Sequence, residues 1–254
     1  MALTALITGA TAGIGEACAE VLAREGYNLI LTGRRADRLE RLGRSLEEKF
    51  GVKTALLNFD VRERGAVEEQ LNALDSAWKH IDVLVNNAGL SQSLDPLQEG
   101  NPDDWDTMID TNIKGLLYVS RVVSAWMAER GSGHIINLGS IAGKEVYPNG
   151  NVYCATKHAV DALNKAMRVD LLQKGIRITA VHPGAVETEF SIVRFKGDEE
   201  KARKVYAGFT PLNAMDVAET VWFVISRPPH VNINEITVMP TAQASATQFN
   251  RNSI

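Results

Sequence analysis

A tyrosine and a lysine stand four residues apart, Tyr153 and Lys157, in a segment with a helical pattern. Side chains at this spacing project from the same face of a helix. A free tyrosine has a pKa of about 10, and a neighbouring ammonium lowers that pKa because it favours the phenolate. The pair therefore predicts a tyrosine that exchanges a proton with a substrate. An ordinary solvated helix face has the same spacing, so the pair alone does not decide.

Two further polar residues stand where they could serve that tyrosine. Ser140 follows a predicted strand, where its hydroxyl would hydrogen-bond a substrate carbonyl or alkoxide oxygen. It would equally cap the segment that follows. Asn112 lies within a predicted helix, although asparagine is an indifferent helix former that hydrogen-bonds locally. We expect it to bend the helix and bind a water that connects to Lys157; the alternative is a solvent-facing asparagine.

A glycine-rich turn follows the first predicted strand and opens into a helix. Glycines there permit a tight turn and let backbone N–H groups approach a pyrophosphate at the helix N-terminus. The spacing Gly-x-x-x-Gly-x-Gly differs from the commoner Gly-x-Gly-x-x-Gly fingerprint, and strand-to-helix turns need glycine in any case. The position after the first strand favours a nucleotide site, for which the candidate residues are Gly9, Thr11, Gly13, Ile14 and Gly15.

Two arginines, Arg34 and Arg35, follow the second predicted strand. NAD-selective sites carry an acidic residue at this strand end to bind the ribose 2′-hydroxyl. The chain has none there, and a guanidinium fork suits a 2′-phosphate. The sequence therefore predicts NADP as the cofactor. Two solvated arginines at a helix start are the alternative.

The third and fourth predicted strands also end in residues that suit a ligand. Ligands bind at the carboxyl ends of the strands in open α/β sheets. Asp60 and Val61 follow the third strand and are candidates for the adenine edge. The fourth strand is followed by Asn87, Ala88 and Gly89. An Asx-type turn without a ligand is the alternative explanation for these residues.

Apolar runs alternate with amphipathic segments along the whole chain. This alternation predicts an α/β fold, a doubly wound parallel sheet of about seven strands with helices on both faces. The predicted strands are Leu3–Thr8, Asn28–Thr32, Thr54–Phe59, Val83–Asn86, His134–Leu138, Arg177–Val181 and Glu235–Val238. The predicted helices are Gly15–Glu25, Ala36–Lys49, Arg64–Lys79, Pro102–Glu129, Asn151–Lys174 and Met215–Arg227.

We expect one domain, residues 1–254, because no linker rich in proline or serine divides the chain. Within it, two segments depart from the alternation of strands and helices. Residues 184–211 are a polar, charged insert between a strand and a helix, and such long loops are usually lids or binding elements. The tail 241–254 has no strong periodicity, so we expect only a partner subunit to order it.

Composition narrows the class of protein. A net charge of −4 gives no basic footprint for nucleic acid, and no apolar run is long enough to span a bilayer. The start of the chain leaves no room for a signal peptide. Two cysteines and five scattered histidines predict neither a disulfide framework nor a metal site. We therefore expect a cytoplasmic protein that acts on a small molecule.

The ordered motifs as a set resemble the short-chain dehydrogenase/reductase family over nearly the whole chain. The resemblance implies a Rossmann-type fold and hydride transfer between a nicotinamide and a substrate carbon. It implies that Tyr153 is the acid/base, that Ser140 orients the substrate oxygen, that Lys157 also binds the nicotinamide ribose, and that Asn112 supports the proton relay. The motif after the sixth strand would hold the carboxamide end of NADP(H), through Pro183, Gly184, Val186 and Thr188. Homotetramers are common in the family, so the resemblance also implies a homo-oligomer.

The insert narrows the resemblance to one branch. Residues 184–191 and 240–243 are similar to those of NADP-dependent 3-hydroxy acid (serine 3-) dehydrogenases, which act on serine, allo-threonine and related acids or reduce semialdehydes. A cation would anchor the substrate carboxylate. Arg194 is the candidate, with Lys196 and Lys144 as alternatives, and an interface or surface ion pair would account for Arg194 equally well.

Other residues and other functions remain open on the sequence alone. Gln92 and Tyr147 are candidate pocket residues, while Cys154 is expected to pack in the core. A broader carbonyl reductase and a non-catalytic NADP sensor are the alternative functions.

Overall fold

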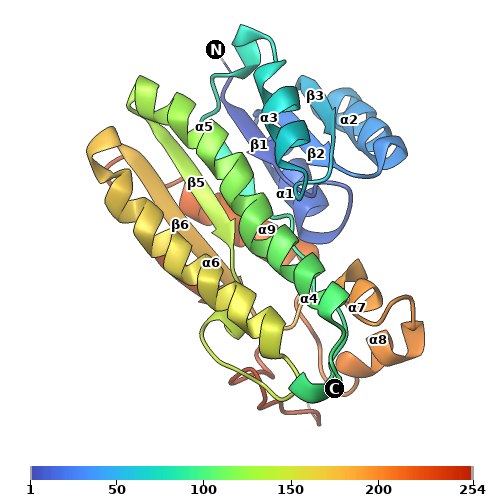
Figure 1. Ribbon diagram of the computed structural model, residues 1–254. Helices are drawn as coiled ribbons and strands as arrows, with labels where there is room; N and C mark the ends of the chain where they lie inside the picture. The colour runs from blue at the N-terminus through green and yellow to red at the C-terminus, as the bar shows by residue number, and fades with distance from the viewer. Residues whose placement is uncertain (1, 253–254) are drawn as a thin grey trace.

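One parallel sheet forms the centre of the computed structural model, which describes residues 2–252. Its seven strands run in the order β3-β2-β1-β4-β5-β6-β7, and every neighbouring pair is parallel (Figure 1). The strand bounds are β1 Thr4–Ile7, β2 Asn28–Gly33, β3 Thr54–Asn58, β4 Val83–Asn86, β5 Gly133–Leu138, β6 Ile176–Pro183 and β7 Glu235–Val238. This architecture confirms the predicted fold class.

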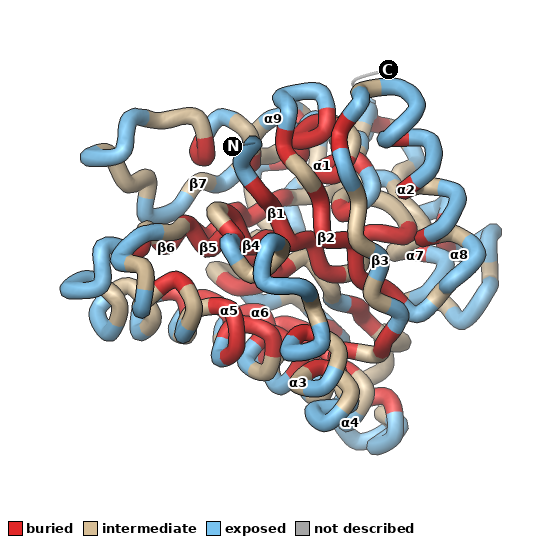
Figure 2. The backbone as a smooth tube through the Cα atoms, turned by 90° about the horizontal axis from the view of Figure 1, so that it is seen from above, coloured by how far each residue is buried: buried red, intermediate tan, exposed pale blue. Residues whose placement is uncertain are grey.

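Helices cover both faces of the sheet. One apolar cluster joins the sheet to α1, α2 and α9, and a second joins it to α3 and α5. Figure 2 shows the buried strands between these two layers. The helix bounds are α1 Gly13–Arg24, α2 Ala36–Phe50, α3 Arg64–Asn72, α4 Pro102–Ile109, α5 Leu116–Arg130, α6 Asn151–Asp170, α7 Glu189–Arg194, α8 Glu199–Val205 and α9 Ala214–Ile225.

The central strands are apolar because both of their faces are covered. Side chains alternate between the faces of a strand, so Leu29 and Leu31 of β2 enter the first cluster while Ile30 enters the second. All three side chains are fully buried. A continuous apolar run therefore predicts a buried parallel strand correctly in this sheet.

The strand order reverses between β1 and β4, which are neighbours in the sheet although two strands separate them in sequence. The connections that follow β1 and β4 lead to opposite sides at this point and leave a crevice at the carboxyl ends of the strands. The glycine-rich turn follows β1, and Asn87 follows β4. The topology thus brings two predicted ligand-binding segments together.

The predicted continuous helix Pro102–Glu129 is wrong in one respect. A π-helical segment, Asp110–Gly115, separates α4 from α5, and it contains Asn112. The wider π turn accommodates this buried asparagine, whose amide bonds to other segments.

The insert 184–211 contains two short helices, α7 and α8, that the polar composition did not predict. Each begins at a side-chain cap: the Thr188 hydroxyl accepts a hydrogen bond from the Phe190 N–H at 3.2 Å, and the Asp198 carboxylate accepts one from the Lys201 N–H at 3.0 Å. Figure 1 shows both helices beside the lower end of α4.

The expectation that only a partner subunit orders the tail is wrong for residues 241–252. Gln243 Oε1 accepts a hydrogen bond from the Ala185 N–H at 2.8 Å. The Arg251 guanidinium donates to the Ala207 carbonyl at 2.6 Å and packs against the rings of Phe209 and Phe249. The chain's own insert therefore holds the tail. Residues 253–254 lie outside the described part of the chain.

Within residues 2–252, no helix combines the length and the apolar character needed to cross a bilayer.

Candidate active site

A cavity of about 600 Å³ lies at the carboxyl ends of the strands, with α7 and the tail along its rim. Its volume is in the usual range for a small-molecule or cofactor site. Of the predicted cofactor residues, every one except Gly15 lines it: Gly9, Thr11, Gly13, Ile14, Arg34, Arg35, Asp60, Val61, Asn87, Ala88, Gly89, Tyr153, Lys157, Pro183, Gly184, Val186 and Thr188.

The glycine-rich turn has a backbone that only glycine adopts easily. Gly9 and Gly13 have φ values of +67° and +56°, in the left-handed region. Gly15 lies behind the turn, where a Cβ would come 2.4 Å from Asn87 Nδ2. That Nδ2 donates to the carbonyls of Thr8 and Gly9 at 2.9 and 3.1 Å. The turn and the end of β4 thus form one wall.

The two arginines after β2 point to different partners. The Arg34 guanidinium is largely exposed and lies 3.7 Å from the Asp60 carboxylate. Arg35 instead donates from Nε and Nη2 to the Thr11 hydroxyl at 3.1 and 3.0 Å, and from Nη1 to Glu189 at 2.9 Å. Arg34 therefore presents a cation at the cavity, whereas Arg35 is partly engaged.

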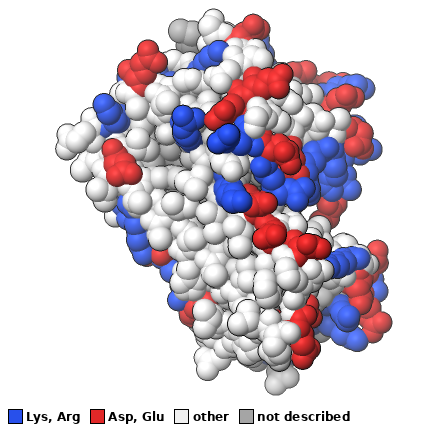
Figure 3. All heavy atoms as spheres, viewed as in Figure 1, with Lys and Arg blue, Asp and Glu red and all other residues white. Residues whose placement is uncertain are grey.

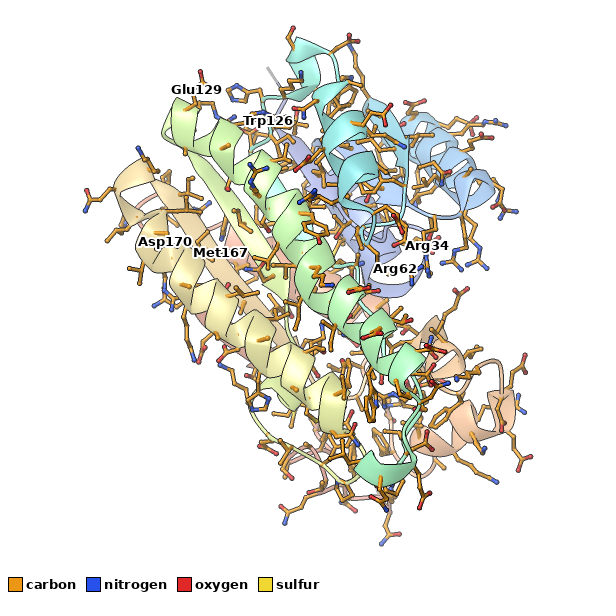
Figure 4. The ribbon with its side chains drawn as sticks, in the orientation of Figure 1. Arg34, Arg62, Trp126, Glu129, Met167 and Asp170 are labelled. Atoms are coloured by element: carbon orange, nitrogen blue, oxygen red, sulfur yellow. The ribbon has the colours of Figure 1, made fainter. Side chains whose placement is uncertain are left out.

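Asp60 has cationic neighbours on both sides. The Arg62 side chain donates to its carboxylate at 2.7 and 3.0 Å, and Figure 4 shows Arg34 and Arg62 close together. Burial acts to raise the pKa of Asp60, but the hydrogen bonds from Arg62 and the charge of Arg34 outweigh it and hold the pKa below its usual range. The carboxylate is therefore ionised and fixed.

Tyr153, Ser140 and Lys157 meet in the same cavity. Tyr153 lies in the first turn of α6, and its hydroxyl hydrogen-bonds the side chain of Ser140. Ser140 Oγ also accepts a hydrogen bond from the Ala142 N–H at 3.1 Å, so it caps the short 3-10 helix Ile141–Gly143 as well. The predicted capping role of Ser140 is therefore confirmed, while its contact with a substrate oxygen stays a prediction. Lys157, one helical turn after Tyr153, donates from Nζ to the Leu138 carbonyl at 2.8 Å.

The structure reverses one expectation about Tyr153. Burial raises its pKa, against the charge of Arg194 and the hydrogen bond with Ser140, which both act to lower it. Burial also lowers the pKa of Lys157, to about 8. The reason is that removing water disfavours the charged form of each group. The prediction that Lys157 lowers the pKa of the phenol below its ordinary value is therefore wrong for this arrangement.

Asn112 does not line the cavity, and its amide is tied to two neighbouring segments. Oδ1 accepts from the Leu90 N–H at 2.9 Å, while Nδ2 donates to the Leu90 carbonyl at 2.8 Å and to Thr156 Oγ1 at 3.0 Å. A Cβ on Gly89 would lie 3.3 Å from Asn112 Oδ1 and 3.5 Å from Lys157 Nζ, so these two groups flank that glycine. Both Nδ2 hydrogens are therefore used, and the side-chain amide can bind the expected water only at Oδ1.

Of the three candidate cations for a substrate carboxylate, only Arg194 lines the cavity. Its guanidinium lies 5.3 Å from the ring centre of Tyr153 and 4.9 Å from that of Phe190. Nη2 donates to the Tyr147 hydroxyl at 3.4 Å, but Nε is buried and has no hydrogen-bond partner among the described residues. A buried donor without a protein partner is available to an acceptor from a water or from a ligand.

The other two cations are engaged elsewhere. Lys196 pairs with Asp104 at 2.8 Å, and Lys144 pairs with Asp161 and Glu235, each at 2.7 Å. Neither lysine lines the cavity, so both alternatives are wrong.

Of the other candidates, Tyr147 lines the cavity and Gln92 does not. Cys154 packs in a small apolar cluster with Leu90 and Met108, as expected.

Sequence reasoning missed a set of residues that complete the rim. They come from the insert and the tail, which lack a periodic pattern, and they include Glu189, Phe190, Tyr206, Gln243, Phe249 and Arg251. The Tyr206 hydroxyl donates to the Val186 carbonyl at 2.8 Å and lies 2.6 Å from Ser191 Oγ, so it ties α7 to the segment after β6. Aromatic residues in a charged insert were the one available signal.

The family model described as short chain dehydrogenase matches residues 3–199. The chain belongs to this family. This short-chain dehydrogenase is 48% identical over 242 residues to the NADP-dependent 3-hydroxy acid dehydrogenase YdfG of Salmonella typhi, covering 95% of this chain and 96% of that protein. It is also 46% identical over 240 residues to sulfoacetaldehyde reductase 2 of Chromohalobacter salexigens, covering 94% of each chain.

Among solved structures, this short-chain dehydrogenase is similar to a closed form of serine dehydrogenase complexed with NADP+. The TM-score is 0.91 at 46% identity, and the match covers 96% of this chain and 97% of that one. The likeness in fold therefore extends over nearly the whole chain.

Proposed function

We propose that this enzyme is an NADP(H)-dependent oxidoreductase that interconverts a small 3-hydroxy acid and its 3-oxo acid or semialdehyde. The observation that carries the proposal is Arg194: a guanidinium with an unpaired buried Nε, beside Tyr153 and in the cavity that the glycine-rich turn also lines. A guanidinium fork is suited to a carboxylate. The names of the relatives, NADP-dependent 3-hydroxy acid dehydrogenase and serine dehydrogenase, support the same substrate class.

The cavity wall suits a dinucleotide. The turn with left-handed φ values at Gly9 and Gly13 would bind the pyrophosphate through its backbone N–H groups. The Arg34 guanidinium would bind the 2′-phosphate. Asp60 and Val61 would hold the adenine, and Asn87, Ala88 and Gly89 would line the path to the nicotinamide. The carboxamide end would lie against Pro183, Gly184, Val186 and Thr188. When bound, the nicotinamide supplies or accepts the hydride.

The chain's own residues move and stabilise the proton. In reduction the Tyr153 hydroxyl donates its proton to the substrate oxygen as that oxygen becomes negative, and in oxidation the phenolate takes the hydroxyl proton back. Ser140 hydrogen-bonds the same oxygen and fixes its position. The Lys157 ammonium would hold the nicotinamide ribose, and Asn112 would support the return of the proton from solvent.

Replacing Arg34 by alanine is expected to weaken NADPH binding about tenfold, the effect of one exposed charge-assisted hydrogen bond. NADH, which lacks the 2′-phosphate, should bind nearly as before. Fluorescence titration with both cofactors measures this. Arg41→Ala is the matched control, because Arg41 is an exposed arginine on α2 that pairs with Asp37 and does not line the cavity. Equal weakening of both cofactors by Arg34→Ala would contradict the assignment.

The affinity for NADPH is expected to fall above about pH 8. Burial lowers the pKa of Lys157 to about 8, so the lysine loses its proton above that pH before the cofactor binds. If the ribose binds the ammonium form, binding takes up one proton there, and Kd should rise about tenfold per pH unit. Below this pKa the lysine is already charged and Kd should stay level. Titrations on both sides of this pKa would show the change in slope, and a flat profile would refute the role.

A panel of substrates with NADP and NAD in parallel tests the proposed function. L-serine, allo-threonine and 3-hydroxypropionate should exceed neutral alcohols of the same size in kcat/KM. If the neutral compounds do as well, the enzyme is a broader carbonyl reductase. If no compound in the panel changes the absorbance of the nicotinamide, the chain is a non-catalytic sensor.

Sulfoacetaldehyde is a second candidate substrate, favoured by the relative that bears its name. It carries a sulfonate where malonic semialdehyde carries a carboxylate, at the same distance from the aldehyde. Arg194 would bind either anion, so the panel includes both aldehydes.

We also propose a homotetramer in the cytoplasm. Leu117 on α5, Val169 on α6 and Leu172 expose apolar side chains, and Figure 3 shows a broad area without charged side chains over α6. Such surfaces are typical of subunit contacts. Cys18 and Cys154 are unpaired and buried, in keeping with a reducing compartment. Analytical ultracentrifugation would give the mass of the assembly, and a monomer at micromolar concentration would contradict the tetramer.

A further inference from the structure

Glu189, in the first turn of α7, bridges two arginines of the cofactor side. Its carboxylate accepts from Arg35 Nη1 at 2.9 Å and from Arg38 Nη1 at 2.7 Å. The hydrogen bonds from Arg38 and Arg35 hold the pKa of Glu189 below its usual range, so the carboxylate is charged at neutral pH. The six-residue helix that begins with Glu189 ends at Arg194 over the Tyr153 ring. One short element of the insert therefore touches both ends of the cavity.

Arg35 does not need Glu189 to be oriented. Its Nε and Nη2 donate to the Thr11 side chain, and Nη2 also reaches the Thr11 carbonyl at 3.2 Å. Thr11 is part of the glycine-rich turn and lines the cavity, so these hydrogen bonds hold the Arg35 guanidinium beside that turn. Only its Nη1 edge is given to Glu189. Arg38 differs, because it does not line the cavity.

We propose that Glu189 competes with the 2′-phosphate of NADP(H) for Arg35, so that the helix α7 of the substrate insert helps to set the cofactor preference. The inference rests on the proposed use of NADP(H). A 2′-phosphate bound between Arg34 and Arg35 brings a second anion to a guanidinium that a carboxylate already neutralises. When the phosphate binds Arg35, Glu189 retains Arg38. NADH has no 2′-phosphate and does not displace the carboxylate.

The variant Glu189→Gln tests the competition, since it removes the charge and keeps the size of the side chain. The Kd of NADPH is expected to fall about threefold to fivefold, the effect of one exposed ion pair, while the Kd of NADH stays unchanged. Glu187→Gln is the matched control. It makes the same change of charge two residues away, at an exposed side chain that has no ion pair within residues 2–252.

The variant Arg38→Ala gives an independent test, in which the Kd of NADPH is expected to rise instead of fall. Without Arg38, Glu189 has only Arg35, so NADPH binding should weaken about threefold while NADH binding is unaffected. In the Glu189→Gln background the same change should have little effect, because the competitor is gone. This double-mutant cycle separates competition from a general loss of positive charge.

The outcomes are distinguishable. If the wild-type enzyme binds NADPH no more tightly than NADH, the proposed cofactor is wrong and the inference falls with it. If it prefers NADPH but Glu189→Gln matches Glu187→Gln, or shifts both cofactors equally, the competition alone is refuted. A selective loss of NADPH affinity in Glu189→Gln would also refute it, because that result would make Glu189 a support for Arg35.

Discussion

The Tyr153→Phe enzyme is expected to lose about 10³-fold in kcat while its affinity for NADPH stays close to that of the wild type. The loss follows because no other acid at this position can protonate the substrate oxygen, and general acid–base catalysis typically contributes ~10²–10⁴-fold. The ring remains, so its contacts with Phe190 and Arg194 are kept. Steady-state kinetics in both directions, with fluorescence titration of NADPH, measure the two quantities.

Tyr147→Phe is the control for this result. Tyr147 also lines the cavity and is half-buried, and its hydroxyl hydrogen-bonds Arg194. Burial raises the pKa of this hydroxyl, and nothing places it as the proton donor. We expect a modest rise in KM for acids and little change in kcat. Substantial turnover by Tyr153→Phe, or an equal loss in Tyr147→Phe, would refute the assignment of Tyr153.

Replacing Arg194 by methionine should lower kcat/KM for a 3-oxo acid about 10- to 100-fold, the range for a hydrogen bond to a charged group. Methionine keeps an apolar stem over the Tyr153 ring, so packing is largely retained. A neutral aldehyde of the same size should be reduced almost as fast as before. The comparison is best made in the reductive direction. Loss of Arg194 raises the pKa of Tyr153 further, and reduction uses the protonated phenol.

Lys196→Met is the matched control for that experiment. Lys196 is two residues from Arg194, and its replacement removes the same charge, but it pairs with Asp104 away from the cavity. Acid and neutral substrates should be affected alike and only slightly. A fall of equal size for acids and neutral aldehydes in Arg194→Met would show that Arg194 supports the fold of the insert and does not bind the carboxylate.

The parallel sheet and the cavity residues at its strand ends could be predicted because the sequence patterns that indicate them are local. Buried parallel strands read as short apolar runs such as Leu29–Leu31, and the ends of those strands must meet at one edge. The residues that follow β1, β2, β3 and β4 therefore converge whatever the details of packing. Ser140 follows β5, and Tyr153 lies in the first turn of α6 with Lys157 one turn later, so the three side chains line one cavity as predicted.

The insert and the tail could not be predicted in the same way, because distant partners determine them. Arg194, Lys196 and Lys144 are equivalent in sequence as cations. Asp104 engages one lysine, and Asp161 with Glu235 engages the other, and each partner comes from another element. Arg251 orders the tail through Phe209, which lies far away in the chain. No periodic pattern encodes such contacts.

The amino-acid sequence was enough to predict the fold class, the candidate residues for proton transfer and the edge of the sheet at which they gather. Each of these follows from local periodicity or from the chemistry of residues in one segment. The direction of the pKa shifts at Tyr153 and Lys157 could not be predicted in this way, because it depends on how fully packing in the folded protein removes water. The tertiary structure also decided that Arg35 is shared with Glu189, a contact across more than half of the chain that depends on where the insert folds.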